Sequence, residues 1–178
     1  QNSSKVYIYR YVEEDTGWKL TAEVLTPLRP GAVANSRVAL SGDGLTLVVG
    51  NYTGGSGQVI VYRFNTAEST WGEVKDWPGE AGDSLGASVA VSSDGAIVAI
   101  RETNIEQRGR VSVYRNTGET WTQMGDADDI VGEVDQDGKG ESLSLSGDGL
   151  TLFASTKRNE QHVYKFNGSR WEKEVLPL

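Results

Sequence analysis

The sequence predicts an all-β chain made of repeated units, each with four short strands. Three markers recur in the same order: a Ser-x-Asp-Gly turn, an alternating run that ends in tyrosine, and a tryptophan shortly after that tyrosine. The aligned tyrosines are 53, 52 and 50 residues apart, and the tryptophans follow them after 9, 9, 7 and 7 residues. A period of this length indicates supersecondary units that stack on one another. No segment shows a sustained helical period of apolar residues.

The first strand of each unit is a short run in which apolar and polar residues alternate, and a tight turn follows it. Such alternation is typical of a strand with one buried face. The Asp-Gly pair behind it favours a hairpin, because glycine adopts positive φ without steric cost. The strands concerned are residues 37–41, 88–92 and 142–146. We predict a structural role in the turns for three aspartates, Asp43, Asp94 and Asp148.

The second strand of each unit is more continuously apolar, which predicts burial on both faces. It covers residues 45–49, 96–100 and 150–154. The third strand carries a Val-x-Val-Tyr pattern, and a polar turn leads to the fourth strand, which starts at a tryptophan. The regular spacing of these tryptophans predicts that they pack between successive units. They are Trp18, Trp71, Trp121 and Trp171.

Stacking of the units around a shared axis follows from their size and composition. One four-stranded sheet cannot bury both of its apolar faces, so it must pack against neighbours. Blades around an axis achieve this and leave only short, protected edges. We therefore predict a β-propeller. A β-sandwich is the alternative, but it offers no reason for a periodic tryptophan.

The repeats fill the chain as about three and a half blades in one domain. A half blade with only the third and fourth strands covers residues 1–36, and full blades cover 37–86, 87–140 and 141–178. Because the chain starts at Gln1 rather than methionine, we expect that an N-terminal portion is absent. A partial propeller leaves an apolar blade face open, so we also expect either a partner chain that completes the propeller or aggregation.

Composition excludes several classes of function. The chain has 17 basic and 25 acidic residues and a net charge of −8, which argues against nucleic-acid binding and against docking on anionic lipid. Its apolar runs are too short to insert in a membrane. The absence of cysteine excludes thiol nucleophiles and zinc ribbons. The single histidine, His162, falls inside a predicted strand with no nucleophile motif nearby, so we predict that the protein is not an enzyme.

One stretch of the middle blade carries a more specific combination of residues. It comprises DSLGASVAVS at 83–92, DGAIVA from Asp94, GRVSVYR at 109–115 and Trp121. This combination resembles the short variety of the FG-GAP repeat, the propeller repeat of integrin α subunits. The flanking blades depart from it, with VANS at 33–36 and DGKG at 137–140. The resemblance implies a recognition role in a secreted, cell-surface or lumenal protein.

We therefore expect a non-catalytic module for protein–protein or protein–glycan interaction. Its binding residues would lie in the loops that join the fourth strand of one blade to the first strand of the next, because these loops vary while the framework repeats. Two alternatives remain. The chain could be an accessory subunit whose neighbour caps the open blade edge, or a non-catalytic fragment of a larger carbohydrate-active enzyme.

The most acidic stretch, residues 126–141, predicts a calcium site. It holds seven acidic residues and one lysine, Lys139. Asp135, Asp137 and Glu141 lie around a glycine turn and supply hard oxygen ligands of the kind that calcium prefers. The resemblance also implies calcium, although Lys139 stands where an acid is expected. A solvated acidic loop is the alternative, and no other cofactor is expected.

Several further residues are candidates for contact or modification. Trp77 lies outside the period, in a predicted loop, and we predict that it contacts a ligand. Asp128 and Asp129 are candidate binding residues in the acidic stretch. N-glycosylation sequons begin at three asparagines predicted to lie in loops or at the terminus, namely Asn2, Asn51 and Asn167.

Overall fold

The structure, a computed structural model, describes residues 3–13, 16–27, 36–52, 55–103, 108–134 and 137–175. Its regular elements are β-strands, grouped in one two-stranded sheet and three four-stranded sheets. Within every sheet, strands that are consecutive in the chain pair antiparallel. The described residues include no helix that is long and apolar enough to span a membrane.

We call the four sheets the half blade and blades 2, 3 and 4. The half blade contains β1 (Ser3–Val12) and β2 (Gly17–Pro27). Blade 2 contains β3 (Ser36–Leu40), β4 (Thr46–Asn51), β5 (Gln58–Asn65) and β6 (Thr70–Pro78). Blade 3 contains β7 (Val89–Val91), β8 (Ile97–Glu102), β9 (Arg110–Asn116) and β10 (Trp121–Gln123). Blade 4 contains β11 (Leu143–Leu145), β12 (Thr151–Ser155), β13 (Gln161–Phe166) and β14 (Trp171–Lys173).

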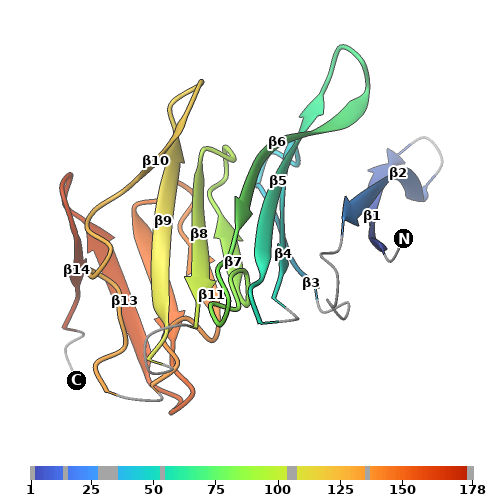
Figure 1. Cartoon of the computed structure of the whole chain (residues 1–178). Coiled ribbons are helices and arrows are strands. Elements are labelled where there is room, and N and C mark those ends of the chain that lie inside the picture. The colour runs from blue at the N-terminus through green and yellow to red at the C-terminus, as the bar shows by residue number, and fades with distance from the viewer. Residues whose placement is uncertain are drawn as a thin grey trace.

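The blades lie side by side in chain order, from β1 to β14 (Figure 1). The first strands of successive full blades, β3, β7 and β11, lie close together, which places them nearest the common axis. Backbone hydrogen bonds join their turns: the N–H of Asp43 donates to Ser93 O, and the N–H of Ser93 donates to Gly147 O, both at 2.9 Å. The predicted fold class, a partial β-propeller, is confirmed.

The hairpin after each first strand is held by a serine and an aspartate. In blade 3 the Ser92 hydroxyl donates to Asp94 Oδ1 at 2.6 Å, and the same oxygen accepts the N–H of Ala96 at 2.9 Å. These hydrogen bonds, first the one from Ser92, lower the pKa of Asp94. Gly95 supplies the positive φ of 70° that the turn needs. Asp43 and Asp148 make the same contacts in blades 2 and 4.

The core is a series of interfaces between blades, because successive strand residues point to opposite faces of a sheet. Val48 and Val61 on one face of blade 2 pack against Val98 of blade 3. Ala99 on the opposite face of blade 3 packs against Leu152 of blade 4. Leu47 and Ile60 of blade 2 likewise pack against Ile8 of the half blade.

One prediction of burial fails in the last blade. The second strands β4 and β8 are buried along almost their whole length, as their apolar sequences predict. In β12, however, buried and half-exposed residues alternate, and Phe153 lies on the more exposed face. The reason is that no blade within the described residues packs on that side, so composition alone overstated the burial of this strand.

The periodic tryptophans occupy the same place at the start of each fourth strand. Trp71 packs with Val6 and Ile8 of the half blade. Trp171 is 2% exposed, and its indole Nε1 donates to the carbonyl of Met124 in blade 3 at 3.1 Å. Each indole therefore covers the boundary with the preceding blade. Trp18, at the equivalent place in the half blade, is 70% exposed.

Candidate functional site

A cavity of about 290 Å³ opens at the boundary between blades 2 and 3. Its wall includes residues from three places: the end of β6, the loop from β6 to β7, and the facing ends of β8 and β9. These segments meet because antiparallel pairing puts the end of β8 opposite the start of β9. The residues that decide its chemistry are Trp77, Asp83, Leu85, Glu102, Arg110 and Tyr114.

Trp77 forms part of the apolar wall. The prediction that it lies in a loop is wrong: β6 continues to Pro78, and Trp77 pairs with Val59 of β5. Its ring centroid lies 5.0 Å from that of Tyr114 and 5.4 Å from that of Trp121. The half-buried indole is therefore held rigidly between two aromatic rings of blade 3. The strand extends this far because β6 stays paired with β5 from Thr70 to Pro78, along the whole length of β5.

A charged pair forms the polar side of the cavity. Arg110 Nε donates to Glu102 Oε1, which also accepts a hydrogen bond from the Ser112 hydroxyl at 3.3 Å. The hydrogen bond to Glu102 is the main cause that raises the pKa of Arg110 above its ordinary value. Burial raises the pKa of Tyr114, so its hydroxyl stays protonated at neutral pH. The cavity thus combines a carboxylate, a guanidinium and a phenol with an apolar wall.

The loop that closes the cavity is tied to both blades. Asp83 Oδ2 accepts the N–H of Glu80 at 2.9 Å, and the carbonyl of Asp83 accepts the N–H of Thr103 at 2.6 Å. Leu85 pairs with Gly57 in an isolated parallel bridge, and its carbonyl accepts the N–H of Gln58. These contacts keep the loop in place, so the cavity is preformed.

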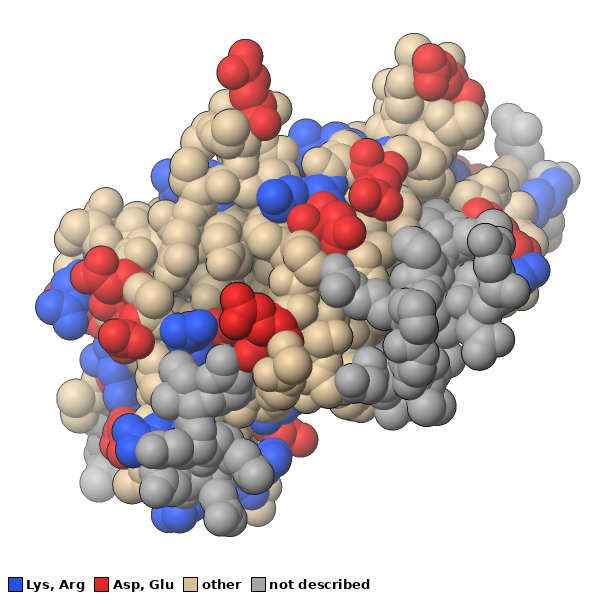
Figure 2. Space-filling model, viewed as in Figure 1, with Lys and Arg blue, Asp and Glu red and all other residues tan. Residues whose placement is uncertain are grey.

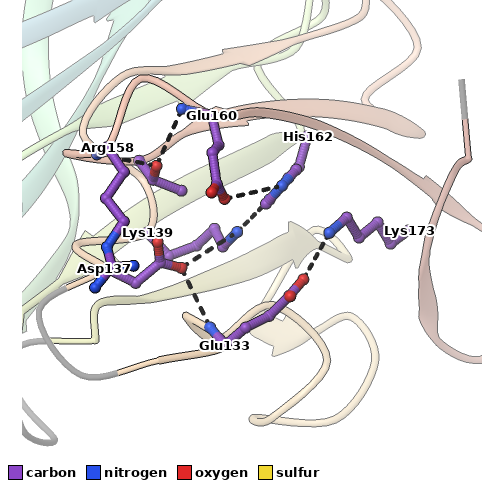
Figure 3. Close-up of polar contacts among 8 residues, drawn as sticks. Glu133, Asp137, Lys139, Arg158, Glu160, His162 and Lys173 are labelled. Carbon is purple, nitrogen blue, oxygen red and sulfur yellow. Dashed lines mark hydrogen bonds and ion pairs between the residues drawn. The ribbon is translucent and has the colours of Figure 1, made fainter. Parts of the chain in front are cut away.

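The equivalent boundary between blades 3 and 4 is filled instead by a buried lysine. Alignment of the repeats places Lys139 at the position of Leu85, Asp137 at that of Asp83, and His162 at that of Ser112. Lys139 is fully buried; its Nζ contacts His162 Nδ1 and lies 3.6 Å from Asp137 Oδ2 (Figure 3). A long charged side chain therefore occupies the boundary where Leu85 leaves an opening.

In the cluster formed by Lys139, Asp137 and His162, burial is the main cause of the pKa shifts of the lysine and the histidine. Burial lowers the pKa of Lys139, and the neighbouring Asp137 carboxylate opposes that shift. Burial also lowers the pKa of His162, and the positive charge of Lys139 adds to the effect. At the exposed edge of the cluster, Lys173 Nζ lies 2.6 Å from Glu133 Oε1, and His162 Nε2 lies 3.6 Å from Glu160 Oε2 (Figure 3).

The structure gives separate partners to the predicted calcium ligands. Asp137 Oδ2 accepts the N–H of Glu133 at 3.2 Å and faces Lys139. Glu141 Oε2 lies 3.1 Å from the buried guanidinium of Arg101. Asp135 lies outside the described residues. Among the residues that are described, no group of three or more His, Cys, Asp or Glu side chains could hold a metal ion, and calcium stays a prediction.

The two predicted binding aspartates, Asp128 and Asp129, differ in their exposure and in their contacts. Asp129 Oδ2 accepts the N–H of Asp126 at 3.0 Å and that of Trp171 at 2.8 Å, so it ties blade 3 to blade 4. Asp128 is exposed, and its charge contributes to the raised pKa of Arg110. Asp129 is thus engaged in the framework, whereas Asp128 lies near the charged pair of the cavity.

The candidate glycosylation sites also lie in different surroundings. The expectation that Asn51 lies in a loop is wrong: it ends β4, is 6% exposed, and its Oδ1 accepts the Ser36 hydroxyl at 2.7 Å. Asn167 is exposed, and its Oδ1 caps the turn before Trp171 by accepting the N–H of Ser169 at 3.0 Å. Asn2 lies outside the described residues.

Comparisons with solved structures agree on the fold. A protein from Lactobacillus plantarum has a TM-score of 0.59 and 14% identity over 97% of this chain, and 48% of that chain is covered. A candidate 6-phosphogluconolactonase from Bacteroides uniformis has a TM-score of 0.63 and 13% identity over 95% of this chain, and 47% of it is covered. A second one, from Bacteroides fragilis, has a TM-score of 0.60, 13% identity, and coverage of 95% and 47%.

These similarities show the fold and no more, because sequence identity is far too low to carry over a function. The chain spans about half the length of the solved structures that it matches. No protein-family model and no curated protein matches the sequence. The resemblance to FG-GAP repeats therefore stays a prediction, as does the extracellular location.

Sequence reasoning missed the charged pair at the cavity. Glu102 follows the predicted second strand of its blade, and Arg110 appears only as part of the GRVSVYR run, so the repeat pattern assigns neither residue to a site. Aligning the blades could have found them: the positions equivalent to Glu102 are Asn51 and Thr156, and only blade 3 places a carboxylate there with a guanidinium at the start of the next strand. Composition carries no such signal, because the pair contributes nothing to net charge.

Proposed function

We propose that the chain is a non-catalytic propeller module that binds the terminal sugars of a glycan in the cavity between blades 2 and 3. One observation carries this proposal: the repeat closes the equivalent boundary with Lys139 and His162 but leaves this one open with Leu85 and Ser112. A gap lined by charged groups, at a position where the next boundary holds a buried lysine, is a feature that packing does not require.

The lining suits a polyhydroxylated ligand. Sugar rings present C–H faces to aromatic walls such as Trp77 and Tyr114, and they present hydroxyl groups that both donate and accept. Glu102 accepts hydroxyl hydrogen bonds, and Arg110 donates to ring or hydroxyl oxygens. The volume of about 290 Å³ lies at the lower end for small-molecule sites, which fits one or two sugar residues.

The overall surface does not point to a polyanion as ligand. The net charge is −8, and Figure 2 shows acidic and basic side chains scattered over the face that it draws, with acidic side chains at the tips of the two projections. The guanidinium in the cavity is neutralised by Glu102. A neutral glycan therefore fits better than a phosphorylated one.

The first experiment is a glycan array with the purified chain, followed by calorimetric titration of the best oligosaccharide. Glu102→Gln removes the charge of the acceptor and should weaken binding about tenfold or more, since a hydrogen bond to a charged group contributes about 1.5–3 kcal/mol. Glu119→Gln, in the exposed turn before β10, is the matched control and should leave affinity unchanged. An array with no bound glycan, or a Glu102→Gln variant that binds normally, refutes the proposal.

A second variant closes the cavity with residues that the chain already uses. Leu85→Lys combined with Ser112→His copies the arrangement of Lys139 and His162, with Asp83 in the place of Asp137. The variant should keep its melting temperature and lose glycan binding. Retained binding in a folded variant would show that the ligand lies elsewhere.

The non-catalytic part of the proposal has its own test. Because two structural neighbours are candidate 6-phosphogluconolactonases, the chain should be incubated with 6-phosphogluconolactone and with nitrophenyl glycosides. We expect hydrolysis at the buffer rate. Turnover above that rate that Glu102→Gln abolishes would make the cavity an active site.

A further inference from the structure

The half blade exposes a continuous apolar face. Tyr9 pairs with Leu20 and Tyr11 pairs with Trp18 across β1 and β2, so these four side chains share one face, and Tyr7 lies on it two residues before Tyr9. Their exposed fractions range from 49% to 70%. We call these five residues, Tyr7, Tyr9, Tyr11, Trp18 and Leu20, the aromatic face. A patch of this kind on a soluble protein usually marks an interface.

The repeat shows what covers such a face elsewhere in the chain. Tyr9 is equivalent to Tyr62 and Tyr164, which are 5% and 4% exposed, and Trp18 is equivalent to Trp171, which is 2% exposed. Tyr164 and Trp171 are buried because blade 3 packs on them. The aromatic face therefore has the composition of a blade-to-blade interface that lacks its neighbour.

The opposite end of the chain offers the complementary face. Phe153 and Val163 form a cross-strand pair of β12 and β13, and both are half-exposed. They are equivalent to Val48 and Val61 of blade 2, which are fully buried because they cover the tyrosine-bearing face of blade 3. We call this pair the outer face of blade 4.

We propose that the aromatic face of one chain binds the outer face of blade 4 in a second copy of the chain. The contact continues the stacking that already joins blades 2, 3 and 4, with the same residue positions on both sides. The contact is head-to-tail, because the two surfaces are different.

The surface next to the aromatic face leaves room for such a partner. A groove of about 610 Å³ runs from Tyr9 and Trp18 to Leu40, Phe64 and Trp71 of blade 2. Leu40 is 53% exposed, although its strand lies nearest the axis. The apolar surface thus continues past the free edge of β1 onto blade 2, and a whole blade covers it better than a single peptide.

The test measures self-association by sedimentation at protein concentrations from roughly 1 to 100 µM, a range that detects micromolar dissociation constants. We expect the wild-type chain to be dimeric or larger at the upper end. Trp18→Arg and Phe153→Arg should each abolish association, and both change exposed or half-exposed side chains, so circular dichroism should stay native. Val74→Arg, an exposed apolar residue of β6, is the control and should associate like the wild type.

Mixing the two variants identifies the surfaces. Trp18→Arg keeps the outer face of blade 4, and Phe153→Arg keeps the aromatic face, so an equimolar mixture should form one intact contact and sediment as a dimer. A wild-type chain that is monomeric throughout overturns the proposal. So does a Phe153→Arg variant that still self-associates, because that result would mean that two aromatic faces pair with each other.

Discussion

At the scale of single residues, the boundary between blades 3 and 4 contains two titratable groups that burial disfavours in their charged forms. The imidazole of His162 faces Lys139, Lys173, Glu133 and Glu160. Its pKa is lowered in the folded chain, so the unfolded chain binds the proton more readily. The free energy of unfolding should therefore fall as the pH drops through the ordinary histidine range near 6.5.

This pH dependence is measured by urea denaturation of the wild type and of His162→Gln at pH 7.5 and 5.5. The wild type should lose stability between these values, and the variant should lose less. The pKa values of Asp94, Asp148 and Glu133 are lowered too, but their contributions disappear only at more acidic pH. Equal slopes for both proteins would contradict the assignment to His162.

The positive charge of Lys139 also stabilises the buried carboxylate of Asp137. Lys139→Met leaves the buried carboxylate of Asp137 without its cation, which should cost about 3 kcal/mol or more of unfolding free energy. Adding Asp137→Asn should recover much of this loss, since the amide oxygen can still accept the N–H of Glu133. If the single variant is as stable as the wild type, the ion pair does not stabilise the boundary.

At the scale of the element, each hairpin depends on its aspartate. Asp94→Ala removes the acceptor for the Ser92 hydroxyl and the Ala96 N–H, and should lower the unfolding free energy by about 1–3 kcal/mol. Asp94→Asn keeps an acceptor oxygen and should cost less. Chemical denaturation of both variants checks this order, and an equal cost for Ala and Asn would show that the hydrogen bonds contribute little.

The start of the fourth strand offers a matched comparison between blades. Trp171→Phe removes the hydrogen bond to the Met124 carbonyl in a buried position and should cost about 1–3 kcal/mol. Trp18→Phe, at the equivalent but exposed place, should change the stability of the monomer by less than about 0.5 kcal/mol. Similar costs at both positions would mean that burial between blades is not what the tryptophan supplies.

At the scale of the whole molecule, stability should vary along the row of blades. The half blade has two strands and one covered face, whereas β8 lies inside a blade that is packed on both sides. A two-stranded sheet has little stability of its own. We therefore expect amide hydrogen exchange at low protein concentration to be fastest in β1 and β2 and slowest in β4, β8 and β9.

The exchange experiment also reports on association. At high protein concentration, exchange in β1 should slow if a second copy covers the aromatic face. Uniform protection across the half blade and blade 3 at low concentration would contradict the gradient, and would mean that the blades unfold as one cooperative unit.

The candidate site could be predicted only in part, and particular residues show why. Trp77 breaks the period in the sequence, and it does line the cavity, yet its place in a strand depends on how far the pairing of β6 with β5 continues. Glu102 and Arg110 are distant from Trp77 in sequence and meet it only through the packing of two blades. The sequence predicts Asp137 as a calcium ligand, and it does not reveal that Lys139 turns inward to face this carboxylate.

The sequence by itself determined the repeat, the four-stranded unit and the turns, since these depend on local alternation, on glycine at positive φ and on a tryptophan at a constant spacing. Only the tertiary structure decided which boundary between blades is open and which is filled. That outcome depends on which side chains from two sheets share the same space: Leu85 and Ser112 at one boundary, and Lys139 and His162 at the other.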